Sequence, residues 1–75
     1  MQKTINVEGK KIKLVTRPIT SMGNITGYRT HIDCRKNGLN IRETFVCMTL
    51  DPQTAMDRAF VLWIKGLDLA KELRA

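Results

Sequence analysis

Residues 28–47 read YRTHIDCRKNGLNIRETFVC, and this stretch decides the fold. Polar and apolar side chains alternate over its first seven residues, which is the period-two pattern of a half-buried strand. The dipeptide Asn37-Gly38 follows, and it is a strong sequence signal for a two-residue hairpin loop. The stretch therefore predicts an antiparallel hairpin over residues 28–48.

A two-residue loop also fixes the register of this hairpin and the face on which each side chain lies. On the predicted core face, Ile32 lies opposite Glu43, which breaks an otherwise apolar pattern unless Glu43 reaches the rim or a bulge shifts the register. The other core-face pairs are Cys34 with Ile41, Thr30 with Phe45 and Tyr28 with Cys47. The pairs on the opposite, polar face are Arg35 with Asn40, Asp33 with Arg42 and His31 with Thr44.

Toward the N-terminus, alternation predicts a second hairpin over residues 3–16. With Gly9-Lys10 as a type II′ loop, Val7 lies opposite Ile12 and the polar side chains fall together on the other face. In this register Ile5 lies opposite Leu14, whereas Lys11 and Lys13 lie on the polar face. Residues 18–27 (PITSMGNITG) contain Pro, Ser and two Gly, a composition that predicts a loop between the hairpins.

Toward the C-terminus, Asp51-Pro52 predicts the start of a helix, because Asp is a favoured N-cap and Pro suits the first helical position. Apolar residues then recur at steps of three or four, which predicts a helix over residues 52–73. The sequence thus indicates an α+β fold in a single small domain, residues 1–75. Its antiparallel sheet has three to five strands, with one C-terminal helix packed on one face.

Charge is distributed unevenly along the chain, which carries a formal +6 over 75 residues. Residues 1–42 hold nine Lys or Arg and two acidic residues, whereas residues 43–75 hold four Lys or Arg and five acidic residues. The sheet-forming part is therefore +7 and the helical part −1. Such asymmetry indicates a polyanion or an acidic partner for the sheet.

Catalytic and metal-binding functions find little support in the sequence. A single His leaves no partner for Cys/His or Ser/His catalysis, and two Cys with one His do not complete a usual zinc site. In the predicted register Cys34 and Cys47 are about 20 Å apart along the strands, too far for a disulfide. We expect no enzyme activity, no cofactor and no metal. The longest apolar run, residues 59–64, is too short for a membrane span, so we expect no membrane association. The N-terminus lacks a signal-peptide pattern, so we expect a cytoplasmic location.

The polar face of the predicted sheet combines Arg, Lys, His, Asn and Thr, which are side chains that contact base edges and phosphates in DNA complexes. We therefore expect duplex DNA as the partner and the following residues as the binding surface: Lys11, Lys13, Arg29, His31, Arg35, Lys36, Asn40, Arg42 and Thr44. Asp33 has a structural interpretation, as a cross-strand ion pair that orients Arg42.

Residues 27–65 resemble the arm-site DNA-binding domain of phage-type tyrosine recombinases, which is related in fold to the plant GCC-box domain. The matching features are Gly27-Tyr28-Arg29 opening a strand, the Asn37-Gly38 turn, Arg42-Glu43-Thr44-Phe45 closing the next strand, and the spaced alanines Ala55 and Ala59. The resemblance implies a three-stranded sheet on a C-terminal helix, with the exposed face in the DNA major groove. It implies DNA contacts from Arg29, His31, Arg35, Asn40, Arg42 and Thr44, and a core of Tyr28, Phe45, Ala55, Ala59, Phe60 and Trp63.

The chain departs from that family by its additional N-terminal hairpin and by having no recombinase catalytic domain after the match. We therefore expect a free-standing DNA-binding accessory or regulatory protein of phage or prophage origin. An alternative function uses the same basic face: a protein-interaction module, such as a phage-type inhibitor, that docks an acidic partner.

The predicted helix is apolar on more than one side. A second stripe, formed by Leu62, Gly66, Leu69 and Leu73, lies away from the side that covers the sheet. Two interpretations stay open: residues 18–27 fold over this stripe, or it forms the contact of a homodimer in which Gly66 allows close approach.

Overall fold

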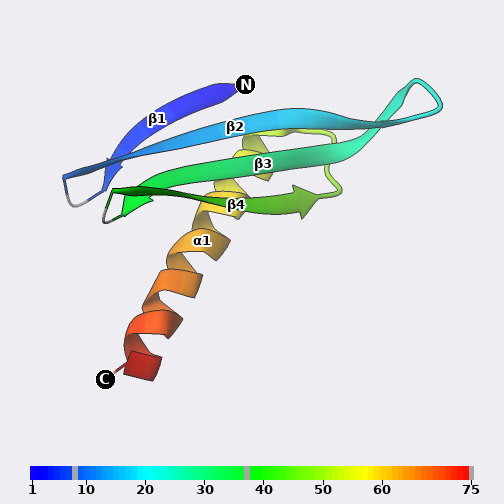
Figure 1. The fold of residues 1–75 in the computed structure, drawn as a ribbon. Helices are drawn as coiled ribbons and strands as arrows, with labels where there is room; N and C mark the ends of the chain where they lie inside the picture. Colours follow the sequence, from blue (N-terminus) through cyan, green and yellow to red (C-terminus); the bar gives the residue numbers. More distant parts are fainter. Residues whose placement is uncertain (8, 37, 75) are drawn as a thin grey trace.

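In the computed structural model, the backbone is described for residues 1–7, 9–36 and 38–74, and the side chains for the same ranges except residues 36 and 67–74. The described part of the chain forms four strands and one helix: β1 (Gln2–Val7), β2 (Lys10–Ser21), β3 (Asn24–Lys36), β4 (Leu39–Cys47) and α1 (Pro52–Arg74). The strands form one antiparallel sheet in the order β1-β2-β3-β4, and α1 packs on one face (Figure 1). The predicted α+β class is confirmed.

The β3–β4 hairpin has the predicted register at every pair. Asp33 lies opposite Arg42 and Ile32 lies opposite Glu43, with no shift along the ladder. Glu43 is exposed, so its carboxylate reaches solvent from the rim of the helix-covered face. No bulge is needed to accommodate it.

The predicted register of the β1–β2 hairpin is wrong by two residues. Val7 pairs with Lys10, and Ile5 pairs with Ile12 and not with Leu14. Gly9 lies in the loop between the paired residues and has a φ of 78°, a conformation that glycine adopts without steric cost. Because the side-chain period of a strand is two, this shift leaves every side chain on its predicted face.

The predicted loop over residues 18–27 is also wrong, because β2 and β3 continue through it as a paired ribbon. Ser21 pairs with Asn24, and the register shifts once, between Ile19 and Thr20. Alternate backbone amides of β2 face the β1 side of the sheet, and Thr16 N donates there to Met1 O at 2.8 Å. Pro18 lies two residues further along β2, so its backbone nitrogen faces the same side, where β1 has already ended. Proline costs no ladder bond at such an edge position.

The core lies between the sheet and the first half of α1. Its buried apolar residues are Ile12, Leu14, Ile32, Ala55, Met56, Ala59 and Trp63. Two buried hydroxyls lie beside them, and Thr16 Oγ1 and Thr30 Oγ1 form a hydrogen bond of 2.8 Å with each other. Of the core implied by the resemblance, Ala55, Ala59 and Trp63 are buried, whereas Phe45, Phe60 and Tyr28 are half-buried. Cys34 and Cys47 are free, as predicted.

Helix α1 begins as Asp51-Pro52 predicts. The Asp51 carboxylate accepts hydrogen bonds from the Gln53 backbone N–H at 3.3 Å and from Thr54 Oγ1 at 2.5 Å. These bonds, led by the one from Thr54, hold the pKa of Asp51 below its usual range. The helix extends to Arg74, one residue beyond the predicted end.

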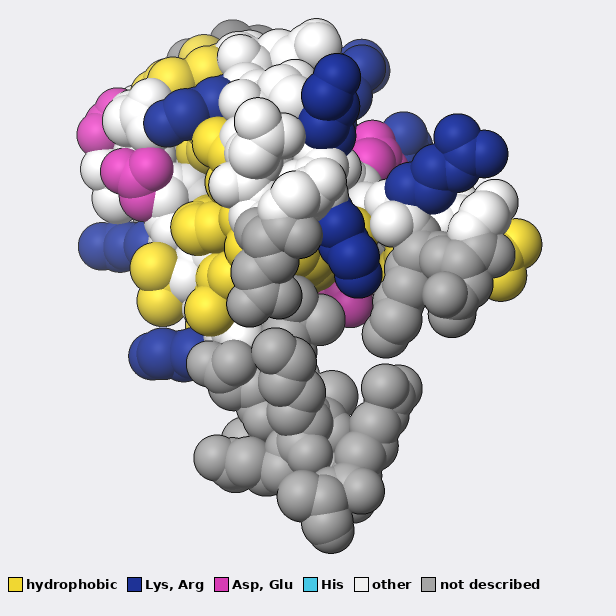
Figure 2. All heavy atoms as spheres, turned by 90° about the vertical axis from the view of Figure 1, so that its left-hand side faces the viewer, with side chains coloured by type: hydrophobic (Ala, Val, Ile, Leu, Met, Phe, Trp, Pro, Cys, Tyr) yellow, Lys and Arg dark blue, Asp and Glu magenta, His cyan; other side chains and the backbone are white. Residues whose placement is uncertain are grey.

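Two parts of the molecule project from the core, and the shape is accordingly elongated. The Cα radius of gyration is 13.6 Å and the extents are 46 × 22 × 18 Å, whereas a compact chain of this length has a radius of about 11 Å. The C-terminal half of α1 leads away from the sheet near the β1–β2 and β3–β4 turns (Figure 1). At that end apolar side chains are visible on the surface of the molecule (Figure 2). Leu39 and Ile41 on β4 are exposed. The other projection is the β2–β3 ribbon.

Candidate nucleic-acid interface

The sheet face opposite α1, called here the open face, is strongly basic. Cross-strand pairing orders them in rows: Thr4, Lys13, Asp33 and Arg42 form one row, and Gln2, Val15, His31 and Thr44 the next. Among the side chains that the structure describes, six Lys or Arg lie on this face with one carboxylate, that of Asp33. The cations are Lys11, Lys13, Arg17, Arg29, Arg35 and Arg42.

The one carboxylate of the open face is already engaged. Arg42 Nε donates to Asp33 Oδ1 at 2.7 Å, and Arg42 Nη2 donates to Asp33 Oδ2 at 3.3 Å. This bidentate hydrogen bonding from Arg42, together with the nearby charge of Lys13, lowers the pKa of Asp33, and the same bond raises the pKa of Arg42. The pair orients Arg42, as predicted, and leaves the other five cations without this carboxylate.

Arg17 and Arg29 lie directly opposite each other on β2 and β3. Like charges at opposite positions repel, and this destabilises the sheet. Among the described side chains, the ion pair between Arg42 and Asp33 is the one salt bridge, so neither Arg17 nor Arg29 is neutralised there. The pair therefore forms a site of concentrated positive charge that an anion would relieve.

A shallow polar hollow of about 180 Å³ lies in the middle of the open face. Its lining residues are Gln2, Lys13, Val15, Arg17, His31, Asp33 and Arg42. His31 Nδ1 lies 2.8 Å from Thr44 Oγ1, a hydrogen bond that orients the imidazole beside this hollow. Donors from all four strands thus surround one concave surface.

The register brings together eight of the nine predicted DNA-contacting residues on the open face: Lys11, Lys13, Arg29, His31, Arg35, Asn40, Arg42 and Thr44. Lys36 pairs with Leu39 at the end of β3, and its side chain lies outside the described residues.

The predicted DNA-contacting set omitted four polar residues of the open face: Gln2, Thr4, Asn6 and Arg17. Continued alternation from Lys11 and Lys13 would have placed Arg17 on the same face. The predicted loop, which began at Pro18, obscured that signal.

The predicted second stripe of the helix is described in part. Leu62 is exposed, and a Cβ added at Gly66 would meet open space. Leu69 and Leu73 lie outside the described side chains. The interpretation in which residues 18–27 cover this stripe is wrong, because that segment lies in the ribbon at the other end of the sheet (Figure 1). Dimerisation stays a prediction.

Other kinds of site were also sought in the described part of the chain. No group of three or more His, Cys, Asp or Glu side chains there is placed to hold a metal ion. No helix within it is long and apolar enough to cross a membrane.

No family model matches the chain, and neither the curated proteins nor the solved structures contain a significant match to it.

Proposed function

We propose that this protein binds duplex DNA through the open face of its sheet. The observation that carries the proposal is the Arg17–Arg29 pair, two opposed cations with no carboxylate partner among the described side chains. A polyanion converts this repulsion into favourable contacts, and DNA offers one phosphate charge per about 1.7 Å of helix axis.

The dimensions and chemistry of the face favour the major groove. Neighbouring strands lie about 4.8 Å apart, so the central β2–β3 pair is narrow enough for a groove about 12 Å wide. The outer strands β1 and β4 then lie over the two phosphate backbones. Arg35 presents a guanidinium fork suited to guanine edges, and Asn40 on β4 presents an amide, whereas Arg29 beside Arg17 is suited to phosphates.

The resemblance to the recombinase arm-site domain implies the same docking face. The fourth strand, β1, is a departure from the three-stranded sheet of that family, and it adds Thr4 and Asn6 to the open face. An accessory or regulatory role of phage or prophage origin stays a prediction.

The test compares two variants that each remove one positive charge. Arg29→Ala acts on the open face, whereas Lys65→Ala removes an exposed cation from α1. Binding to a fluorescein-labelled random 20-bp duplex is followed by anisotropy from 25 to 200 mM salt. We expect Arg29→Ala to weaken binding and to reduce the slope of log K against log salt by about one, with Lys65→Ala close to wild type.

Two results would contradict the proposal. The first is no duplex binding by the wild type at 25 mM salt. The second is an equal effect of both variants, which would assign binding to net charge and not to this face.

A further inference from the structure

The β2–β3 ribbon extends beyond both neighbouring strands as a free arm, residues 18–27 (Figure 1). Gln2, the first residue of β1, pairs with Val15, and Cys47, the last residue of β4, pairs with Tyr28. At the base of the arm Pro18 pairs with Tyr28, and beyond it residues 19–27 form ladder pairs only with one another. They contain no Lys, Arg, Asp or Glu, in contrast to the strands from which they emerge.

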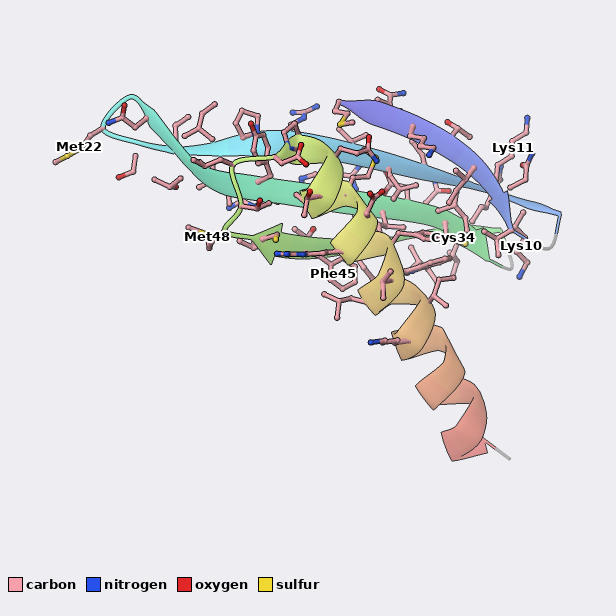
Figure 3. All side chains as sticks on the ribbon, turned by 180° about the vertical axis from the view of Figure 1, so that it is seen from behind. Lys10, Lys11, Met22, Cys34, Phe45 and Met48 are labelled. Atoms are coloured by element: carbon pink, nitrogen blue, oxygen red, sulfur yellow. The ribbon has the colours of Figure 1, made fainter. Side chains whose placement is uncertain are left out.

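The residue at the tip of the arm is unusual in three respects. Met22 is fully exposed (100%), is apolar, and has a φ of 52°. Gly23 follows with a φ of 80°, so both residues of the loop have positive φ, as in a type I′ turn. Gly, Asn or Asp is preferred at the first of these positions, because positive φ brings Cβ close to the backbone, and Gly lacks a Cβ while Asn and Asp can offset the strain with local hydrogen bonds. Figure 3 shows Met22 pointing away from the rest of the molecule.

Neither turn stability nor packing accounts for methionine at this position. A strained, exposed residue indicates a functional contact when the fold gains nothing from it. Ile25, on the same arm, is also exposed (45%), so the tip region offers a small apolar surface and no charge. The contact must therefore be made with something outside the described chain.

We infer that the arm enters the DNA minor groove and that Met22 wedges between base pairs there. This inference rests on the proposed function, because the arm continues the two strands that the open face would place in the major groove. Met22 lies five residue steps beyond Arg17, a reach of about 17 Å at ~3.3 Å per residue. That reach carries the tip across one phosphate backbone, since the grooves are about 12 and 6 Å wide.

The side chains of the arm are of kinds that bind in the minor groove. Methionine is among the apolar side chains that proteins insert at minor-groove base steps, where they unstack the bases and bend the duplex. Asn24 lies beside the tip, and its amide can donate to the acceptors of the minor-groove floor. The Arg17–Arg29 pair at the base of the arm would hold the intervening phosphates.

The experiment uses Met22→Asn, with Met48→Asn as the control. Asn-Gly is a preferred type I′ sequence, so Met22→Asn keeps or stabilises the hairpin while removing the apolar wedge. Met48 is also an exposed methionine (68%), but it lies outside the arm. Bending is measured by energy transfer between the ends of a labelled 30-bp duplex, and unstacking by the fluorescence of 2-aminopurine placed along it.

We expect the wild type and Met48→Asn to bend the duplex and to brighten 2-aminopurine. Met22→Asn should lose both signals and keep the salt slope of binding, because the phosphate contacts belong to the open face. Two results would overturn the role of the arm and leave the proposed function standing. In the first, the wild type binds the duplex without bending it; in the second, Met22→Asn bends the duplex as the wild type does. No duplex binding by the wild type would overturn both this role and the proposed function.

Discussion

The two faces of the sheet differ in whether their polar groups have partners within the protein. On the face covered by α1, the polar groups that are buried satisfy each other, as Thr16 and Thr30 do at 2.8 Å. On the open face, six cations share one carboxylate, and Arg42 already occupies it. The comparison teaches that the covered face supplies stability while the open face retains unsatisfied charge, so substitutions on the two faces should have separable effects.

The largest effect is expected from Ile32→Ala, which tests the covered face at its centre. Ile32 is fully buried (0%), and truncation leaves a cavity that should cost about 2–5 kcal/mol. Val15→Ala is the matched change on the open face, where the side chain is half-buried, and it should cost several times less. Urea unfolding followed by circular dichroism measures both. Equal costs would remove the distinction between the faces.

The next effect concerns Gly27, at the base of the arm. A Cβ added there would lie 2.8 Å from the Cys47 carbonyl oxygen and 2.9 Å from Met48 Sδ. Gly27→Ala should therefore destabilise the fold by about 1–3 kcal/mol. The control is Gly66→Ala, where nothing lies within 4 Å of the added atom and helix propensity predicts a gain of about 1 kcal/mol. Opposite shifts of the thermal midpoint are the expected result, and shifts of the same sign would contradict it.

A smaller net effect is expected from the paired hydroxyls of the covered face. Thr16→Val or Thr30→Val alone leaves one buried hydroxyl without its partner and should cost about 1–3 kcal/mol. The double variant removes both groups and should cost less than the sum of the two single changes. A double-mutant cycle by urea unfolding measures this coupling. Additive costs would show that the hydroxyls act independently.

The smallest effect is expected on the open face, from Asp33→Asn. Because the pKa of Asp33 is lowered in the folded protein, its carboxylate contributes stability above the unfolded pKa of about 3.9. That contribution is lost as pH falls through the lowered folded-state pKa. Asp33→Asn should therefore reduce the loss of unfolding free energy at acid pH. Asp51→Asn should reduce it further, since the pKa of Asp51 is also lowered and Asn caps helices without titrating. An acid limb that neither variant changes would show that other groups control it.

The sequence was most informative where a turn motif agreed with hydrophobic alternation. Asn37-Gly38 fixes the loop length of the β3–β4 hairpin, so the predicted register was correct at all of its pairs. At Gly9 the glycine was correctly assigned to the loop, but its position within that loop was wrong, because both type I′ and type II′ turns accept glycine. The face of each side chain was still correct, since the error was an even number of residues.

The arm could not be predicted from its composition. Pro, Ser and Gly indicate a loop on average, yet Pro18 lies where β2 has no neighbour on one side and Met22 adopts positive φ without being Asn or Gly. Local preferences for both residues oppose the structure, and tertiary placement overrides them. The open face was predicted largely from alternation. It omitted Arg17 because the predicted strand ended at residue 16, five residues before β2 ends at Ser21.

The strand order β1-β2-β3-β4 has a consequence for how the chain folds during synthesis. Each strand pairs with its neighbours in sequence, so the sheet can zip together from local hairpins without a crossover. The helix that covers the sheet comes last, and Trp63 closes the core. We therefore expect a nascent chain to expose the apolar face of its sheet until about residue 63 has emerged. Limited proteolysis of chains truncated before residue 52 would show whether the sheet resists cleavage without that cover.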